Sequence, residues 1–249
     1  MGRCRYMSVF SPDERADLPK GCKAVIALTS WKKRIKTVGL TIFQLYRTCP
    51  GFHIVLTLSK EEFPKGEREL PKDLRVLATN GVCELLWVNK NYKAFKKLLF
   101  ASMKYRSVPV ISADDDCIYR FNYAEQLYRM WKLHPHDRIC YWCSSMGHGI
   151  FNTSGYATLH PPGYYKDAAL LLNDEIVELR EDDLFYAAIC ELNGYKGCIC
   201  LNKDYNDIVV PHDEIAPLHT YYRKGQSSKD RYATMLKAVK RARDEHNRK

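Results

Sequence analysis

The stretch Val108-Pro-Val-Ile-Ser-Ala-Asp-Asp-Asp-Cys-Ile-Tyr119 carries the strongest structural signal in this 249-residue chain. The apolar run from Val108 to Ala113 is typical of a buried strand, and three consecutive aspartates follow it directly. Adjacent carboxylates repel one another, so ordinary folding does not explain this cluster. A divalent cation removes the repulsion, because Mg²⁺ and Mn²⁺ prefer oxygen ligands. The pattern therefore predicts a metal site at the end of a strand, with a solvated turn as the alternative.

The residues around this stretch alternate between strand and helix patterns. Apolar runs predict strands, and apolar residues at helical spacing predict helices, with a loop between the second strand and the third. The expected strands are residues 23–29, 53–58, 83–88 and 108–113, and the expected helices are residues 34–48 and 92–105. This alternation predicts an α/β fold with a mostly parallel sheet and helices on both faces. In such sheets ligands bind beyond the carboxyl ends of the strands, where the aspartates lie.

The second half of the chain has a less regular pattern. We expect helices at residues 122–133 and 181–193, the latter ended by Gly194, strands at 138–144 and 195–201, and a loop at 148–165. The length suits one domain over residues 1–222, with a first half at about 23–120 and a second half at about 121–222. A basic amphipathic helix is expected to follow at residues 223–249.

The ten cysteines are interpreted as reduced, small hydrophobic side chains, because most of them stand singly within apolar runs. Cys140-Tyr-Trp-Cys143 and Cys198-Ile-Cys200 form the two pairs with close spacing. Alternation along one strand would send Cys140 and Cys143 to opposite faces, and the Cys-x-Cys spacing is unusual for zinc. We therefore do not expect a zinc site from the sequence.

The net charge of +10 is concentrated at the C-terminus. Residues 223–249 contain ten Lys or Arg against three Asp or Glu, a net charge of +7 that leaves +3 for the rest of the chain. A basic amphipathic helix can lie on an anionic membrane, but it can equally dock on the domain with a solvated basic face. No recognised nucleic-acid signature accompanies the charge, so we do not expect nucleic acid as a partner.

The chain contains no apolar stretch of about 20 residues and no apolar signal core near Met1. We therefore expect a cytoplasmic protein, with peripheral contact to the cytosolic membrane face through the basic tail as an open hypothesis.

A second acidic group, Glu181-Asp182-Asp183, opens the expected helix at residues 181–193. Acidic residues in a first helical turn complement the helix dipole, which explains them without any function. Beside a metal site, Asp182 or Asp183 is instead a candidate general base for deprotonating a hydroxyl.

These motifs, taken in order, resemble bacterial glycosyltransferases of the GT-A fold, similar to family 2. The resemblance covers residues 23–220 and rests on Leu28-Thr-Ser30, Arg34-Ile35, Lys96-Lys-Leu98, Ile111 to Tyr119 with its D-x-D element, Glu181 to Leu184, and Leu192-Asn-Gly-Tyr195. It implies a nucleotide-sugar donor, with UDP favoured, a saccharide or lipid-linked acceptor, and an inverting transfer in surface polysaccharide or glycolipid synthesis. It also implies Mn²⁺ or Mg²⁺ as the cofactor, and a domain with its donor half at about residues 23–120 and its acceptor half at about 121–222.

The same resemblance implies roles for single residues. Thr29, Ser30, Arg34, Lys97, Asp114 and Asp115 would bind the donor. Asp116 and Asp114 would contact the metal ion, with His212 or His219 as a late additional ligand. Asp182 or Asp183 would be the catalytic base. One feature departs from the family: Leu58-Ser-Lys60 stands after the second strand, where many relatives carry an aspartate that binds the nucleobase.

Two other classes of enzyme use carboxylates with metal ions. Phosphatases with an aspartate nucleophile carry their D-x-D just after the first strand, whereas this cluster follows the fourth. Nucleotidyltransferases usually have a glycine-rich basic loop after the first strand, and Thr29-Ser-Trp-Lys-Lys-Arg34 contains no glycine. A nucleotidyltransferase, or another metal-dependent nucleotide-binding enzyme, remains the main alternative.

Overall fold

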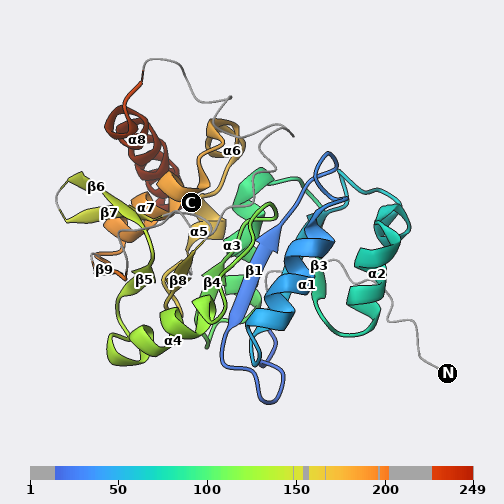
Figure 1. Cartoon of the computed structure of the whole chain (residues 1–249). Helices are drawn as coiled ribbons and strands as arrows, with labels where there is room; N and C mark the ends of the chain where they lie inside the picture. Colours follow the sequence, from blue (N-terminus) through green and yellow to red (C-terminus); the bar gives the residue numbers. More distant parts are fainter. Residues whose placement is uncertain are drawn as a thin grey trace.

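A seven-stranded mixed sheet forms the centre of the protein (Figure 1). The computed structural model describes residues 15–147, 149–153, 157–165, 167–195, 197–201 and 226–248. The strands lie in the order β3-β2-β1-β4-β8-β5-β9. Their bounds are β1 Val25–Thr29, β2 His53–Ser59, β3 Glu84–Val88, β4 Val110–Ser112, β5 Arg138–Cys140, β8 Thr158–His160 and β9 Cys198–Cys200. The first four strands are parallel, β8 is antiparallel to both of its neighbours, and β5 and β9 are parallel to each other.

The central strand β1 divides the hydrophobic core into two layers, because successive side chains of a strand point to opposite faces. Val25 and Ala27 pack with the cluster that includes helices α3, α5, α7 and α8. Ile26 and Leu28 pack with the cluster that includes α1, α2 and α4. The sheet is therefore covered by helices on both faces, which confirms the fold class expected from the alternating pattern.

The helices of the first half largely follow the sequence pattern. They are α1 Val38–Thr48, α2 Lys72–Thr79, the short 3₁₀ turns η1 Gly66–Glu69 and η2 Lys93–Phe95, and α3 Lys96–Lys104. Helix α1 begins four residues later than expected, because residues 32–37 form turns. Helix α2 was not expected; its sequence holds only one fully buried residue, Leu74, so the apolar periodicity is weak.

The second half departs further from the expectations. It contains α4 Tyr123–Leu133, the hairpin β6 Cys143–Gly147 and β7 Ile150–Thr153, and then α5 Ala168–Leu171, α6 Asp174–Leu179 and α7 Asp182–Leu192. The single strand expected at 138–144 is broken at Tyr141 and Trp142 into β5 and β6. The loop expected at 148–165 is wrong in part, because β7 and β8 lie within it. Helix α7 ends as expected, with Gly194 in the left-handed region at φ 76°.

The C-terminal helix α8, Ser228–Asn247, docks on the domain through its apolar side. Its side chains Tyr232, Met235 and Val239 are buried in the same core cluster as α7. Ser227 caps the helix together with Asp230 in a capping box. Of the two hypotheses for the basic tail, the structure therefore bears out docking for the apolar side.

None of the helices within the described ranges is long and apolar enough to span a membrane.

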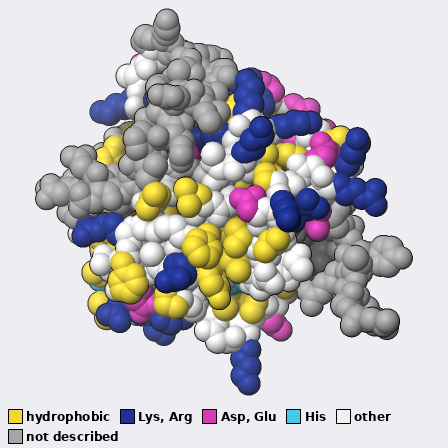
Figure 2. Space-filling view, turned by 45° about the vertical axis from the view of Figure 1, so that its right-hand side comes forward, with side chains coloured by type: hydrophobic (Ala, Val, Ile, Leu, Met, Phe, Trp, Pro, Cys, Tyr) yellow, Lys and Arg dark blue, Asp and Glu magenta, His cyan; other side chains and the backbone are white. Residues whose placement is uncertain are grey.

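Hydrophobic side chains also reach the surface, and Figure 2 shows several of them among Lys and Arg on the face it presents. The outer side of α1 exposes Leu40, Phe43 and Tyr46, at spacings of three residues. The opposite side of the helix, with Val38, Ile42 and Leu45, is fully buried, as the sequence spacing predicts. Helix α1 is thus apolar on both sides, and only one of them has a partner among the described residues.

A partly buried ionic group joins β2, β3 and α3 at the amino end of the sheet. The Glu84 carboxylate accepts hydrogen bonds from His53 and from Lys104, each at 2.8 Å, and from the Tyr105 hydroxyl. Burial alone would raise the pKa of Glu84, but these three hydrogen bonds lower it to about 2. The charged form is thus strongly favoured in the folded protein.

We expect Glu84→Gln to lower the free energy of unfolding by about 3 kcal/mol at neutral pH, because a pKa lowered from 4.5 to about 2 corresponds to that difference. Since the folded pKa is depressed, this contribution is present above about pH 4.5 and is lost as the pH falls toward about 2. Urea denaturation of wild type and variant across this range measures the difference. Glu178→Gln, which removes a 66% exposed carboxylate, is the control and should have little effect. A constant difference between wild type and Glu84→Gln at all pH values would contradict the prediction.

Candidate active site

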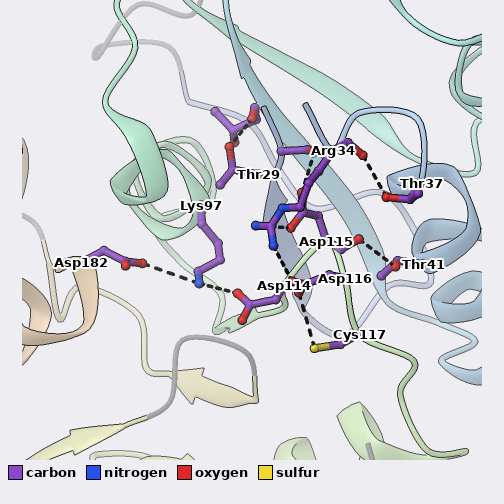
Figure 3. A network of polar contacts seen from close by, with 12 residues as sticks. Thr29, Arg34, Thr37, Thr41, Lys97, Asp114, Asp115, Asp116, Cys117 and Asp182 are labelled. Carbon is purple, nitrogen blue, oxygen red and sulfur yellow. Dashed lines mark hydrogen bonds and ion pairs between the residues drawn. The ribbon is translucent and has the colours of Figure 1, made fainter. Parts of the chain in front are cut away.

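The candidate site lies at the carboxyl ends of the parallel strands, beside the point where the strand order reverses between β1 and β4 (Figure 3). Chain segments that follow β1, β2 and β3 line a cleft of about 240 Å³ there. Its lining includes Thr29, Ser30, Trp31 and Arg34 after β1, Glu62 after β2, Asn91, Lys93, Ala94 and Lys96 after β3, and Arg180 just before α7. Two of the aspartates after β4, Asp115 and Asp116, pair with Arg34 of this cleft.

Asp115 is the buried member of the three aspartates, with its side chain 2% exposed. It accepts a hydrogen bond from the Ser30 hydroxyl at 2.6 Å and pairs with the Arg34 guanidinium at 2.8 Å. Its backbone carbonyl accepts from Thr41 on α1 at 3.1 Å. Burial raises the pKa of Asp115 to about 6, against the lowering effect of Arg34 and Ser30. Asp115, unlike Asp114 and Asp116, is therefore buried, and it holds Ser30 and Arg34 in place.

Asp115 and Asp116 lie in a turn after β4 and both pair with Arg34, whereas the Asp114 carboxylate points to Lys97 (Figure 3). Oxygens of the Asp114 and Asp116 carboxylates and the Cys117 sulfur lie within 4.8 Å of one another. Burial and the charge of Asp114 raise the pKa of Asp116, which disfavours the charged form of the Asp116 carboxylate.

The donor atoms of this cluster fit a hard divalent cation. Two carboxylates supply oxygen ligands, and a cation between them would relieve their repulsion. The Cys117 sulfur is a soft ligand, which Mn²⁺ and Mg²⁺ bind less readily than carboxylate oxygens. Asp114 and Asp116 are thus the residues that would hold Mn²⁺ or Mg²⁺. The other expected ligands, His212 and His219, lie outside the described residues.

Lys97 links the aspartates after β4 to helix α7 (Figure 3). Its ammonium lies 2.7 Å from Asp114 and 3.6 Å from Asp182. Burial would lower the pKa of Lys97, but Asp114, Asp182 and Asp183 raise it well above its usual value. Lys97 therefore stays charged, and the structure brings together the two acidic motifs that lie more than sixty residues apart in the sequence.

Asp182 and Asp183 occupy different environments at the start of α7. Asp182 is buried, and its Oδ2 atom accepts no hydrogen bond within the described part of the chain. Asp183 is partly exposed. The preceding residue, Glu181, pairs with Arg231 of α8 at 2.7 Å. Of the two expected base candidates, Asp182 is the one paired with Lys97 beside Asp114.

Three further residues support the site and were not expected from the sequence. The Tyr119 hydroxyl accepts a hydrogen bond from the Asp114 backbone at 2.7 Å, and Gln44 of α1 accepts one from the Tyr119 backbone at 3.1 Å. Both hold the turn that carries the aspartates. Glu62 lines the cleft and accepts from Lys96 at 2.7 Å and from Ser59 at 2.9 Å. The cleft thus has a carboxylate after β2, two residues beyond Leu58-Ser-Lys60, the stretch in which the family resemblance implies an aspartate.

Comparison with known proteins yields matches at the level of structure only: no family model and no curated protein matches the chain. The structure of TarS residues 1–349 from S. aureus is similar over 90% of this chain and 72% of that chain, with a TM-score of 0.50 and 12% identity. The mannosyltransferase PcManGT from Pyrobaculum calidifontis, solved in complex with GDP-Man and Mn²⁺, is similar over 98% of this chain and 79% of that chain, with a TM-score of 0.53 and 10% identity. The chain therefore shares its mixed α/β fold, with a mostly parallel sheet covered by helices, with these two proteins.

Proposed function

We propose that this protein is a metal-dependent glycosyltransferase that moves a sugar from a nucleotide-sugar donor to a saccharide or lipid-linked acceptor. The observation that carries the proposal is the convergence of Asp114, Asp116, Lys97 and Asp182 beside a cleft at the carboxyl edge of the sheet. The fold is shared with a mannosyltransferase that binds GDP-Man and Mn²⁺, which supports the same class of donor here. As part of the proposal, a UDP-sugar is the favoured donor, and the product belongs to a surface polysaccharide or glycolipid.

In this proposal the cleft binds the nucleotide and the acidic cluster lies at its diphosphate. Thr29, Ser30 and Arg34 line the cleft next to the aspartates, and Glu62 offers a carboxylate that can accept hydrogen bonds from a nucleobase. A divalent cation held by Asp114 and Asp116 would neutralise the leaving diphosphate. Arg34, which pairs with Asp116, adds a positive charge that favours a phosphate nearby.

Transfer with inversion requires a base for the acceptor hydroxyl. We assign this role to Asp182, since it lies beside Lys97 and Asp114 with a carboxylate oxygen free of hydrogen bonds from described residues. The acceptor oxygen bonds to the anomeric carbon as Asp182 takes its proton, while the bond from that carbon to the diphosphate oxygen breaks. Lys97 lies between Asp114 and Asp182, at 2.7 and 3.6 Å, and orients both carboxylates.

The test is a calorimetric and thermal-shift screen of UDP, GDP, CMP and their sugars, with and without Mn²⁺. We expect one nucleotide class to bind in a Mn²⁺-dependent manner. The corresponding sugar nucleotide should release free nucleotide in the presence of an acceptor. The absence of any metal-dependent nucleotide binding by folded protein would refute the proposed function. Metal-dependent binding of a nucleoside triphosphate, with pyrophosphate release, would support a nucleotidyltransferase instead.

A membrane role for α8 would have to use its outer basic face, because its apolar side is buried. Lys237, Lys240 and Arg248 are exposed there. We propose that these cations attract an anionic bilayer, which would suit a lipid-linked acceptor and a peripheral position on the cytosolic membrane face. Pelleting with liposomes containing anionic lipid should recover wild type at low salt and much less of the Lys237→Glu, Lys240→Glu double variant. Equal recovery of both proteins would refute the membrane contact.

A further inference from the structure

Three cysteine thiols converge at the edge of the sheet that lies beyond β8, away from the acidic cluster. The sulfur atoms of Cys140, Cys143 and Cys198 lie within 4.8 Å of one another, and those of Cys140 and Cys198 are 3.5 Å apart. Cys140 ends β5, Cys143 begins β6, and Cys198 begins β9. The expectation that Cys140 and Cys143 point to opposite faces is wrong, because the strand breaks between them and the chain changes direction.

The register of β5 and β9 explains how Cys198 joins this group. Cys140 is the partner of Cys200, and Cys198 is the partner of Arg138. Residues that are partners, or two apart along a strand, share one face of a sheet, so Cys140, Cys198, Cys200 and Arg138 belong to the same face. Cys200 donates a hydrogen bond to the Tyr141 carbonyl at 3.2 Å, which keeps its thiol near the group.

We propose that Cys140, Cys143 and Cys198 bind a zinc ion. Zinc accepts thiolate ligands at about 2.3 Å in tetrahedral geometry, which separates neighbouring sulfurs by about 3.8 Å. The Cys140–Cys198 separation of 3.5 Å is close to that value, and the other sulfur separations do not exceed 4.8 Å. Water or Cys200 can complete the tetrahedron. Each thiol that binds releases its proton to solvent, so the step needs no oxidant or reductant.

The charge of the surroundings fits such a site. Three thiolates and one Zn²⁺ carry a net charge of −1, which is costly to bury without a nearby cation. Arg138 is almost fully buried, and its guanidinium donates to the Phe151 carbonyl at 2.8 Å. It forms no ion pair with a carboxylate inside the described ranges, and its Nε atom has no hydrogen-bond partner there. A buried cation without an acidic partner, on the same face as two of the thiols, would balance the anionic metal cluster.

The ion would connect three elements that are otherwise weakly joined. Strand β9 has only three residues and lies at the edge of the sheet, and the β6–β7 hairpin forms a separate two-stranded sheet. Zinc bound by Cys140, Cys143 and Cys198 would link β9 and the β6–β7 hairpin to β5. The role we assign is therefore structural, and it does not depend on the proposed transferase activity.

The full chain, purified under reducing conditions and freed of metal by a chelator, is titrated with Co²⁺ and then with Zn²⁺. We expect thiolate-to-cobalt charge-transfer absorption that saturates at one ion per chain and disappears when Zn²⁺ displaces the cobalt. Cys198→Ser and Cys143→Ser should each weaken binding by at least about 100-fold. Cys22→Ser, at a cysteine of similar partial burial outside the group, and Asp116→Ala should leave the absorption unchanged.

Native mass spectrometry of wild type, purified without a chelator, provides a measurement that does not depend on the variants folding; retention of one zinc ion supports the proposal. Three results would overturn the proposal. Wild type could give no thiolate-to-cobalt absorption, or Cys198→Ser and Cys143→Ser could both bind Co²⁺ as tightly as wild type. The third is a Cys140–Cys198 disulfide in protein that was alkylated on isolation without added oxidant.

Discussion

Asp116→Ala is expected to abolish Mn²⁺-dependent nucleotide binding and to lower turnover by about 10³-fold. The carboxylate is one of the two oxygen ligands that we propose for the metal ion, and a metal ion at a leaving diphosphate contributes several kcal/mol to transition-state stabilisation. About 4 kcal/mol corresponds to a factor of about 10³ in rate. Calorimetry with the nucleotide found in the screen, with and without Mn²⁺, measures the binding, and release of free nucleotide measures turnover.

Two control variants separate the loss of a ligand from the loss of structure. Cys117→Ser changes the neighbouring side chain, whose soft sulfur we do not expect to bind Mn²⁺, and it should retain Mn²⁺-dependent binding. Asp244→Ala removes an exposed carboxylate from α8 and should behave as wild type. The Asp116→Ala variant itself should fold, because Arg34 keeps its ion pair with Asp115. Mn²⁺-dependent affinity equal to that of wild type in Asp116→Ala would show that the cluster holds no catalytic metal ion.

The second large effect is expected from Asp182→Asn, which should lower kcat by about 10²- to 10⁴-fold, the usual contribution of a general base. Asparagine has nearly the same shape but cannot accept the proton of the acceptor hydroxyl. Donor affinity should stay close to that of wild type, because Lys97 keeps its 2.7 Å pair with Asp114. Turnover under saturating donor and acceptor, together with calorimetric donor binding, measures the two effects separately.

Asp183→Asn is the matched control, since it makes the same chemical change one residue along the same helix. Asp183 is partly exposed, whereas Asp182 is buried beside Lys97, so Asp183→Asn should keep most of the activity. If Asp183→Asn lost activity and Asp182→Asn kept it, the roles of the two residues would be exchanged. If both retained full activity, the acceptor would be deprotonated without help from α7.

Much of the first half of the fold was predictable, because each strand there is a short apolar run that ends in polar residues. β1 to β4 lie where such runs indicated, and their parallel order follows from the helices between them. Asp114 and Asp116 were recognisable as a candidate metal site for the same local reason: three adjacent charges after a buried strand need an explanation. Helix α2 escaped prediction because it buries little apolar surface.

The sequence by itself determined the alternating α/β architecture and the acidic cluster after β4, because both depend on residues close together in the chain. Only the tertiary structure decided which side chains meet. The antiparallel strand β8 is inserted between β4 and β5, and three residues carry too little periodicity to reveal it. Two groups of side chains each come from three separate parts of the chain: Lys97, Asp114 and Asp182, and Cys140, Cys143 and Cys198. The distances within each group depend on strand order, register and helix docking. Those are properties of long-range packing, which no local pattern encodes.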